Sequence, residues 1–297
     1  MYSRLSPSLR GMLMMFVASV SAVFMHATVR HLSAELPPFE MAFFRNFLAL
    51  AFLLPMLLRE GLQPLRTKKW RLHVLRSALT TVSMLSFFTA LSLSPLAQIT
   101  ALSFTAPLFA TLLAIIFLGE VVRVRRWIAI IIGFIGTLVI LRPGLVEIDL
   151  GAFLTLFAAG CWGAAIAMTR VLGRTESSLT ITLYMAFVMA PLSLIPATFV
   201  WTWPSWHQLA WLLLIAGFGT LTQLCFSQSL REAKTSVVMP IDFFKLIWAS
   251  LLGYVLFAER PDLFTWIGGG LIFASATYIA YRESKLKKAV IAYSNDE

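Results

Sequence analysis

Long apolar runs alternate with short polar connections along nearly the whole chain. Most of these runs hold about 20 residues, which is the length of α-helix that crosses a hydrocarbon core of about 30 Å. The short connections leave no room for an inserted soluble domain. The runs are residues 11–29, 39–58, 76–94, 97–118, 127–141, 150–169, 179–200, 208–229, 236–257 and 263–281. The pattern predicts an all-α membrane protein with ten transmembrane helices.

The composition agrees with this prediction and excludes several other classes. Hydrophobic residues make up 59% of the 297 residues, charged residues make up 13%, and the mean hydropathy is +0.83. Soluble domains are typically about 45–50% apolar and about 25% charged. The net charge of +10 does not indicate nucleic-acid binding, because the basic residues lie between the apolar runs. Cys161 and Cys225 lie within apolar runs, so we expect free thiols and no disulfide framework, metal site or cofactor.

The positions of lysine and arginine predict the orientation in the membrane. When the ten helices cross alternately, eighteen of the 24 basic residues fall on the side of the N-terminus and three on the other side. The remaining three, Arg45, Arg76 and Lys245, fall inside helices or at their ends. Because cytoplasmic connections are enriched in basic residues, we expect both termini to be cytoplasmic.

The two halves of the chain share a sparse internal repeat. Each half holds five predicted helices, so the halves must have opposite orientations in the membrane. Inverted repeats of this kind underlie alternating access in many secondary transporters. We therefore divide the chain into repeats at 1–145 and 146–284 and a cytoplasmic tail at 285–297. Residue pairs at an offset of 139 or 140 include Phe104 with Phe243, Glu120 with Glu259, Trp127 with Trp266, Gly11 with Gly151, and Arg30 with Arg170.

Several segments resemble the EamA-type members of the drug/metabolite transporter superfamily. They are "FEMAFFRNFLALAFLLP" (39–55), "SPLAQITALSFTAPLFATLLAIIFLGE" (94–120), "RWIAIIIGFIGTLVILRPG" (126–144) and "AKTSVVMPIDFFKLIWASLLGYVLFAERPD" (233–262). The resemblance implies a ten-helix carrier of the bacterial inner membrane, with a central cavity between its halves and a small-molecule substrate. "FEMAFFR" (39–45) and "HVLR" (73–76) look nearest to the carriers of S-adenosylmethionine and riboflavin. The oligomeric state is left open between a monomer and a homodimer.

The strongest candidate for a substrate or proton site is the pair Asp242 and Lys245 in the ninth apolar run. Residues three apart on a helix share a face and can neutralise each other. Pro240 donates no backbone hydrogen bond, so it should kink the helix and free carbonyl groups nearby. Ionisable groups at this depth are usually functional, although a purely structural ion pair is the alternative. Asp242 is the candidate for proton coupling.

Further candidates complete the predicted substrate site. Ser103 occupies the place of Asp242 in the first half, and Thr105 offers a second hydroxyl. Phe243 and Trp162 are the aromatic candidates. Arg45 either meets a substrate carboxylate or phosphate, or pairs with Glu40 at the start of the same helix.

The other membrane-embedded arginine, Arg76, is expected to snorkel toward the cytoplasmic surface. We therefore predict a secondary active transporter of a small metabolite that is amino-acid-, vitamin- or nucleoside-like. The alternatives are an exporter of amino acids, metallophores or drugs in the same fold, and a lipid flippase. A polytopic membrane enzyme is the weakest alternative, because no cluster of acids or nucleophiles lies at one membrane face.

Overall fold

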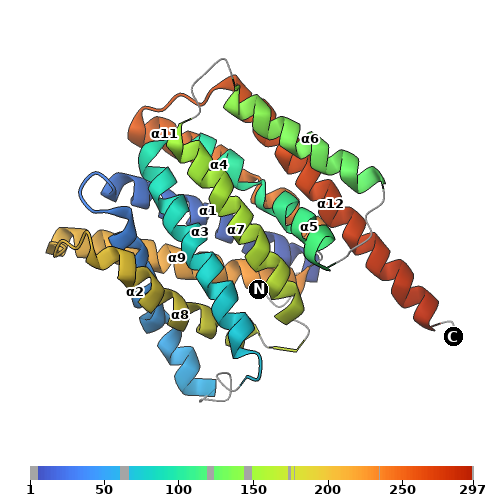
Figure 1. The fold of residues 1–297 in the computed structure, drawn as a ribbon, viewed down its shortest axis with the longest axis horizontal. Helices are drawn as coiled ribbons and strands as arrows, with labels where there is room; N and C mark the ends of the chain where they lie inside the picture. The colour runs from blue at the N-terminus through green and yellow to red at the C-terminus, as the bar shows by residue number, and fades with distance from the viewer. Residues whose placement is uncertain are drawn as a thin grey trace.

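The computed structural model describes residues 6–60, 67–118, 124–143, 149–172, 175–176, 178–233 and 235–295, which are nearly all helical. Figure 1 shows the helices within these ranges. They are α1 (Pro7–Leu32), α2 (Pro38–Glu60), α3 (Trp70–Leu93), α4 (Leu96–Ser103), α5 (Ala106–Leu118), α6 (Val124–Leu141), α7 (Leu150–Leu172), α8 (Ser178–Thr198), α9 (Trp206–Glu232), α10 (Thr235–Asp242), α11 (Phe244–Phe257) and α12 (Leu263–Asn295).

The structure confirms that every predicted apolar run is helical. Within the described ranges, eight stretches are long and apolar enough to cross a membrane, and two shorter apolar helices lie at 127–141 and 263–279. The shorter ones belong to α6 and α12. Hydrophobic length alone therefore located the helices correctly.

Local signals fix where individual helices begin. The Ser6 hydroxyl accepts a hydrogen bond from the Leu9 backbone N–H at 3.3 Å, and Pro7 occupies the first position of α1. Ser205 and Gln208 form a reciprocal capping box at the start of α9. These groups satisfy backbone N–H donors that have no partner inside the helix.

The fourth and ninth apolar runs are each interrupted near the middle. The first break, between α4 and α5, lies at Phe104 and Thr105, and the second, between α10 and α11, lies at Phe243. Pro107 and Pro240 lie close to these breaks. Pro240 lies inside α10 and removes one bond from the helical ladder because proline has no backbone N–H, whereas Pro107 lies in the first turn of α5, where an N–H has no partner inside the helix. The kink predicted at Pro240 stays a prediction, because α10 runs through Pro240 and the break lies three residues further along the chain.

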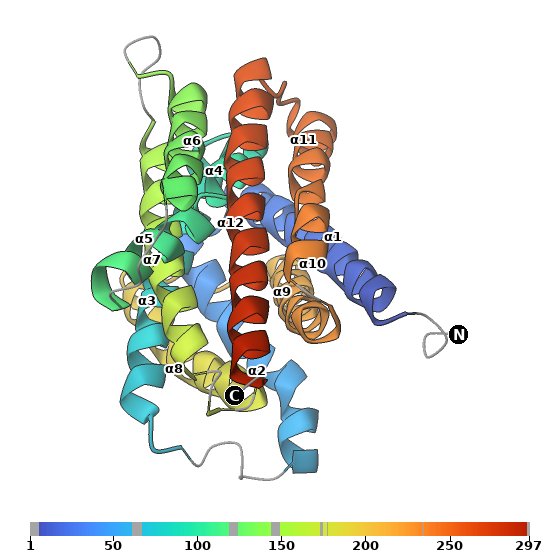
Figure 2. The same cartoon turned by 90° about the vertical axis from the view of Figure 1, so that its right-hand side faces the viewer.

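The most extensive packing joins helices from different halves of the chain. α1 packs along α9, α3 along α7, α2 against α8, and α6 along α12. Figure 2 shows α6 and α12 side by side. These last two helices come into backbone contact, since a Cβ atom added to Gly268 would lie 2.5 Å from the Gly136 carbonyl oxygen. In the repeat, α1 corresponds to α7 and α9 corresponds to α3, so exchanging the halves turns the first pair into the second. α2 with α8 and α6 with α12 are each a pair of counterparts. A twofold relation between the halves requires this pattern.

Candidate functional site

The structure brings Asp242 and Lys245 together across the break between α10 and α11. Asp242 Oδ1 lies 2.6 Å from Lys245 Nζ, and their side chains are 15% and 19% exposed. The hydroxyl of Ser19, a buried residue of α1, donates to the same Asp242 oxygen at 3.3 Å. The predicted ion pair is therefore present, and it lies against a helix of the other half.

The two helix breaks lie against each other. The ring centroids of Phe104 and Phe243, one from each break, are 5.8 Å apart. Phe273 of α12 packs against both rings, with its centroid 4.4 Å from that of Phe243. Sequence positions 139 residues apart thus meet at the interface between the halves.

The two hydroxyl candidates of the first break bond to their own backbone. Ser103 Oγ donates to the Thr100 carbonyl, and Thr105 Oγ1 donates to the Leu102 carbonyl, both at 2.7 Å. The Thr105 side chain is fully buried. In this arrangement both hydroxyls complete the turn at the break, because they satisfy carbonyls near the end of α4.

Trp162 lies on a different helix from the ion pair. It is a half-buried residue of α7, which packs against α3, α4 and α5. Beside it, Gly163 brings α7 against the backbone of α5, where an added Cβ would lie 2.7 Å from the Ala110 nitrogen. α10 and α11 pack mainly against α1, α4 and α12, so Trp162 and the ion pair lie on helices that share α4 as a neighbour and do not pack extensively against each other.

Arg45 borders a narrow pocket between α2, α8 and α9, with a cavity volume of about 20 Å³. Arg45 Nη1 donates to Asn46 Oδ1 at 2.9 Å, and Asn46 Nδ2 donates to Ser193 Oγ at 3.2 Å. The guanidinium lies over Gly219 of α9, where an added Cβ would be 2.9 Å from Arg45 Nε. The lining residues are Arg45, Asn46, Ala49, Leu53, Thr182, Met185, Ala186, Thr220, Gln223 and Leu224.

The alternative of an ion pair between Arg45 and Glu40 is wrong. Glu40 Oε2 accepts hydrogen bonds from the backbone and hydroxyl of Thr202, at 3.2 Å and 3.0 Å. This carboxylate therefore joins the start of α2 to the segment before α9. Arg45 lies more than one turn further into α2, where it contacts Asn46.

The expectation that Arg76 snorkels is also wrong. Its side chain is only 5% exposed. Arg76 Nε donates to Thr169 Oγ1 of α7 at 2.6 Å, and Nη2 lies 3.9 Å from Met185 Sδ of α8. Because α3 begins at Trp70, Arg76 lies about 9 Å inside the helix, on a face that α7 and α8 cover.

His26 lies between the ion pair and the pocket. It follows Ser19 by seven residues on α1, so both side chains share a face and are about 10 Å apart. Its ring packs edge-on against Phe87, with centroids 5.0 Å apart. One face of α1 therefore connects the two polar centres.

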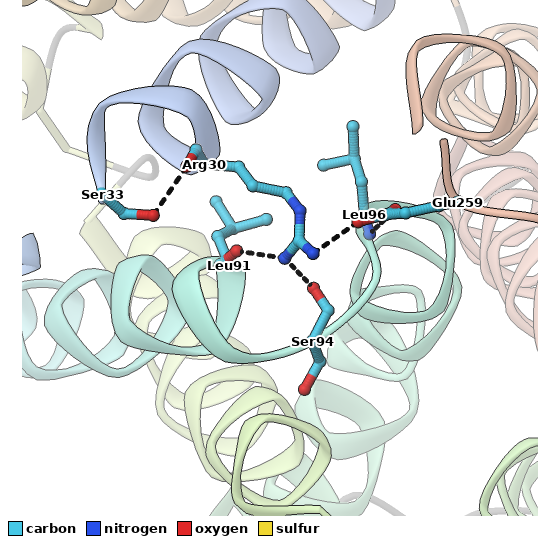
Figure 3. Close-up of polar contacts among 6 residues, drawn as sticks. All are labelled: Arg30, Ser33, Leu91, Ser94, Leu96 and Glu259. Carbon is cyan, nitrogen blue, oxygen red and sulfur yellow. Dashed lines mark hydrogen bonds and ion pairs between the residues drawn. The ribbon is translucent and has the colours of Figure 1, made fainter. Parts of the chain in front are cut away.

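Figure 3 shows a third polar cluster, which the sequence did not single out as a site. Arg30, near the end of α1, donates through Nη1 to the carbonyls of Leu91 and Ser94 and pairs with Glu259 at 2.5 Å. Glu259 accepts from the backbone N–H of Leu96 at 2.8 Å. The Arg30 guanidinium thus binds carbonyl groups at the C-terminal end of α3, and the Glu259 carboxylate binds a backbone N–H at the N-terminal end of α4. Helix dipoles favour both placements.

The only sequence signal for this cluster is the repeat, which pairs Arg30 with Arg170 and Glu259 with Glu120. Glu120 and the side chain of Arg170 lie outside the described part of the structure. Among the described residues, no group of three or more His, Cys, Asp or Glu side chains could hold a metal ion.

Comparisons with known proteins match this arrangement to one transporter family. The chain is 30% identical over 256 residues to the S-adenosylmethionine uptake transporter of Rickettsia felis, which covers 86% of this chain and 87% of the relative. It is 32% identical over 284 residues to the riboflavin transporter of Vibrio cholerae, covering 93% and 95%. A solved crystal structure shares the fold over 92% of this chain and 98% of its own, with a TM-score of 0.61 and 18% identity.

Residues 9–142 and 149–281 each match the EamA-like transporter family. This result confirms the resemblance seen in the sequence and points to a transporter of small metabolites and not to an enzyme. With its apolar helices and bacterial relatives, the protein is a multi-pass integral protein of the bacterial inner membrane. The chain belongs to the EamA-like transporter family.

Proposed function

We propose that the protein is a secondary active transporter that moves a small organic metabolite across the inner membrane by alternating access. The contact between the two helix breaks supports this proposal most directly. Phe104 and Phe243 meet where the fourth apolar segment of one half touches that of the other. Broken helices in membranes free backbone groups that need a protein or water-filled surrounding, and transporters use them at substrate sites between repeats.

In this proposal the chain crosses the membrane ten times as two inverted repeats, 1–145 and 146–284, followed by a tail at 285–297. Both termini are cytoplasmic. The excess of basic residues on one side supports this orientation. The pairing of α1 with α9 and of α3 with α7 supports the repeat, because the two pairs exchange when the halves are exchanged.

In this proposal the substrate contacts residues from both halves of the chain. Asp242 and Lys245 provide exchangeable charges, since a substrate or proton that enters can replace either member of the pair. Asp242 is the proposed site of proton coupling. The proposed substrate-binding residues are Asp242, Lys245, Ser103, Thr105, Arg45, Phe243 and Trp162.

The substrate class is an amino-acid-, vitamin- or nucleoside-like metabolite. Relatives that match most of the chain are named for uptake of S-adenosylmethionine and transport of riboflavin, which makes these two compounds the first to test. Both combine a planar ring system with polar groups.

Counterflow in proteoliposomes tests the proposal without knowledge of the driving force or direction. Liposomes that contain the purified protein are loaded with unlabelled S-adenosylmethionine or riboflavin and diluted into labelled compound. We expect transient accumulation of label for at least one compound, and none in liposomes without protein. If neither these compounds nor a panel of amino acids and nucleosides gives counterflow, the proposed function is wrong.

A further inference from the structure

Arg45 and Arg76 are cationic side chains inside the helix bundle that have no acidic partner among the described residues. Within the described residues, Arg45 donates to an amide oxygen and Arg76 to a hydroxyl. Other described cations have carboxylate partners: Arg10 pairs with Glu232, Arg30 with Glu259, Arg142 with Asp262, and Lys245 with Asp242. Two guanidinium groups inside the helix bundle therefore carry positive charge that no neighbouring acid neutralises.

Both guanidinium groups keep a buried nitrogen without a hydrogen-bond partner. These atoms are Arg45 Nε and Arg76 Nη1. Arginine has five N–H donors in a rigid planar fork and stays charged in proteins. Burying such a group without a counter-charge is costly, so an arrangement of this kind is normally completed by an anion.

One of the two arginines lines the pocket, and the other lies behind its wall. Arg45 lines it directly, and Arg76 Nη2 lies 3.9 Å from the sulfur of Met185, which also lines it. Thr220 adds a buried hydroxyl without a partner, so unpaired polar atoms gather at this place. The remaining wall is largely apolar, with Ala49, Leu53, Ala186 and Leu224. The pocket is therefore cationic at one end and mostly apolar elsewhere.

We infer that Arg45 and Arg76 together bind an oxyanion group, a carboxylate or a phosphate, of the transported substrate in the pocket between α2, α8 and α9. The inference rests on the proposed transport function and narrows its substrate class to anion-bearing metabolites. It separates the two compounds suggested by the relatives, because S-adenosylmethionine carries a carboxylate and riboflavin carries neither group. A substrate with its anion at Arg45 would extend along α1 toward His26 and the Asp242 pair.

A purely structural role for the arginines predicts a different response to mutation. If Arg76 serves mainly to hold α3 to α7 through Thr169, Arg76→Gln should lower the unfolding temperature of the ligand-free protein. If the arginines form an empty anion site, removing one unpaired buried charge should leave that temperature unchanged or raise it, because functional sites are often destabilising. The ligand-free unfolding temperatures of Arg45→Gln and Arg76→Gln distinguish these cases.

Anion-dependent stabilisation is the direct test. Purified protein is unfolded thermally in increasing sodium phosphate or sodium acetate, with ionic strength held constant by sodium chloride. We expect saturable stabilisation of the unaltered protein, with at least a roughly tenfold higher half-saturating concentration in Arg45→Gln and Arg76→Gln, the loss expected for a charged hydrogen bond. Arg142→Gln is the matched control, since this arginine is paired with Asp262 and outside the pocket. Equal stabilisation in all four proteins would overturn the inference.

Matched ligand pairs then identify the anion. The binding of S-adenosylmethionine is compared with that of its decarboxylated analogue, and a difference reports a contact with the carboxylate. The binding of flavin mononucleotide is compared with that of riboflavin, and a difference reports a contact with the phosphate. The anion-bearing member should bind roughly tenfold more tightly or better, and each arginine variant should reduce that preference. Counterflow without any arginine-dependent anion effect would refute the oxyanion site and leave transport standing. An arginine-dependent anion effect without counterflow would refute transport and leave the anion site.

Discussion

Asp242 and Lys245 form a nearly neutral unit inside the bundle, and this neutrality explains how the bundle accommodates two charges. Each partner lowers the cost of burying the other, and Ser19 supplies one further hydrogen bond to the carboxylate. A neutral pair can store a proton only if the carboxylate separates from the lysine during the transport cycle. The pair is therefore suited to coupling when a substrate competes for one of its members.

Replacing Asp242 tests proton coupling at the residue scale. Asp242→Asn keeps the shape of the side chain but removes the titratable proton, so uptake driven by a pH gradient should fall to the level of protein-free liposomes. Counterflow, which needs no proton movement, should persist. Asp242→Glu is the control because it remains titratable and should keep a measurable part of the driven uptake. Driven uptake that is unchanged in Asp242→Asn would exclude this residue as the coupling group.

Arg45 and Arg76 show how little a side chain's sequence position says about its environment. Both lie within or at the ends of apolar runs. Position alone left Arg45 open between a substrate anion and Glu40, and suggested that Arg76 reaches the surface. Their actual neighbours, Asn46 on the same helix and Thr169 on α7, are neutral. Glu40, the acid nearest to Arg45 in the sequence, instead accepts hydrogen bonds from Thr202.

At the scale of elements, the Arg30 cluster holds three segments at one end of the molecule. Arg30 comes from α1, its carbonyl acceptors from the connection between α3 and α4, and Glu259 from the chain after α11. Glu259 also caps α4 through the backbone of Leu96. If the proposed orientation holds, this cluster closes the outer end, and it would have to open during alternating access.

Glu259→Gln tests the contribution of this cluster. The variant keeps an oxygen for the Leu96 N–H but loses the ion pair with Arg30, whose partners are 19% and 12% exposed. We expect the free energy of unfolding to fall by about 1–2 kcal/mol. The more exposed pair of Arg142 and Asp262, at 28% and 38%, should contribute about 0–1 kcal/mol, so Arg142→Gln serves as the comparison. Thermal unfolding of both variants measures the difference, and an equal loss would contradict a special role for Glu259.

At the scale of the whole molecule, the inverted repeat makes a prediction about sidedness. The connection between α7 and α8 and the connection between α8 and α9 must lie on opposite sides of the membrane. Both contain exposed positions, Thr175 in the first and Trp203 in the second. Cytoplasmic termini place Thr175 inside the cell and Trp203 outside.

Cysteine labelling measures this sidedness. The two native cysteines, Cys161 and Cys225, are first replaced by serine, and a single cysteine is then introduced by Thr175→Cys or Trp203→Cys. A membrane-impermeant maleimide applied to intact cells should label only Trp203→Cys. In inside-out vesicles, it should label only Thr175→Cys. The reverse pattern would overturn the proposed orientation, and labelling of both positions from one side would overturn the proposed number of spans.

The sequence by itself determined the helical segments, the family and the ion pair. Each of these depends on local or linear information. An apolar run of about 20 residues is helical in a membrane because its backbone groups must bond internally. Two ionisable residues three apart meet through helical geometry alone. Pro240 predicted a disruption within the ninth segment, and the family segments are recognisable directly from the sequence.

Only the tertiary structure decided which residues share a site. It brought the two breaks together at Phe104 and Phe243, and it placed Trp162 on a helix that does not pack extensively against α10 or α11. It also placed Arg45 in the wall of a pocket and Arg76 behind that wall, and it joined Arg30 to Glu259. The physical reason is that these neighbours lie on different helices, often more than a hundred residues apart. Their contacts follow from how whole helix faces pack, which a pattern along the chain does not encode.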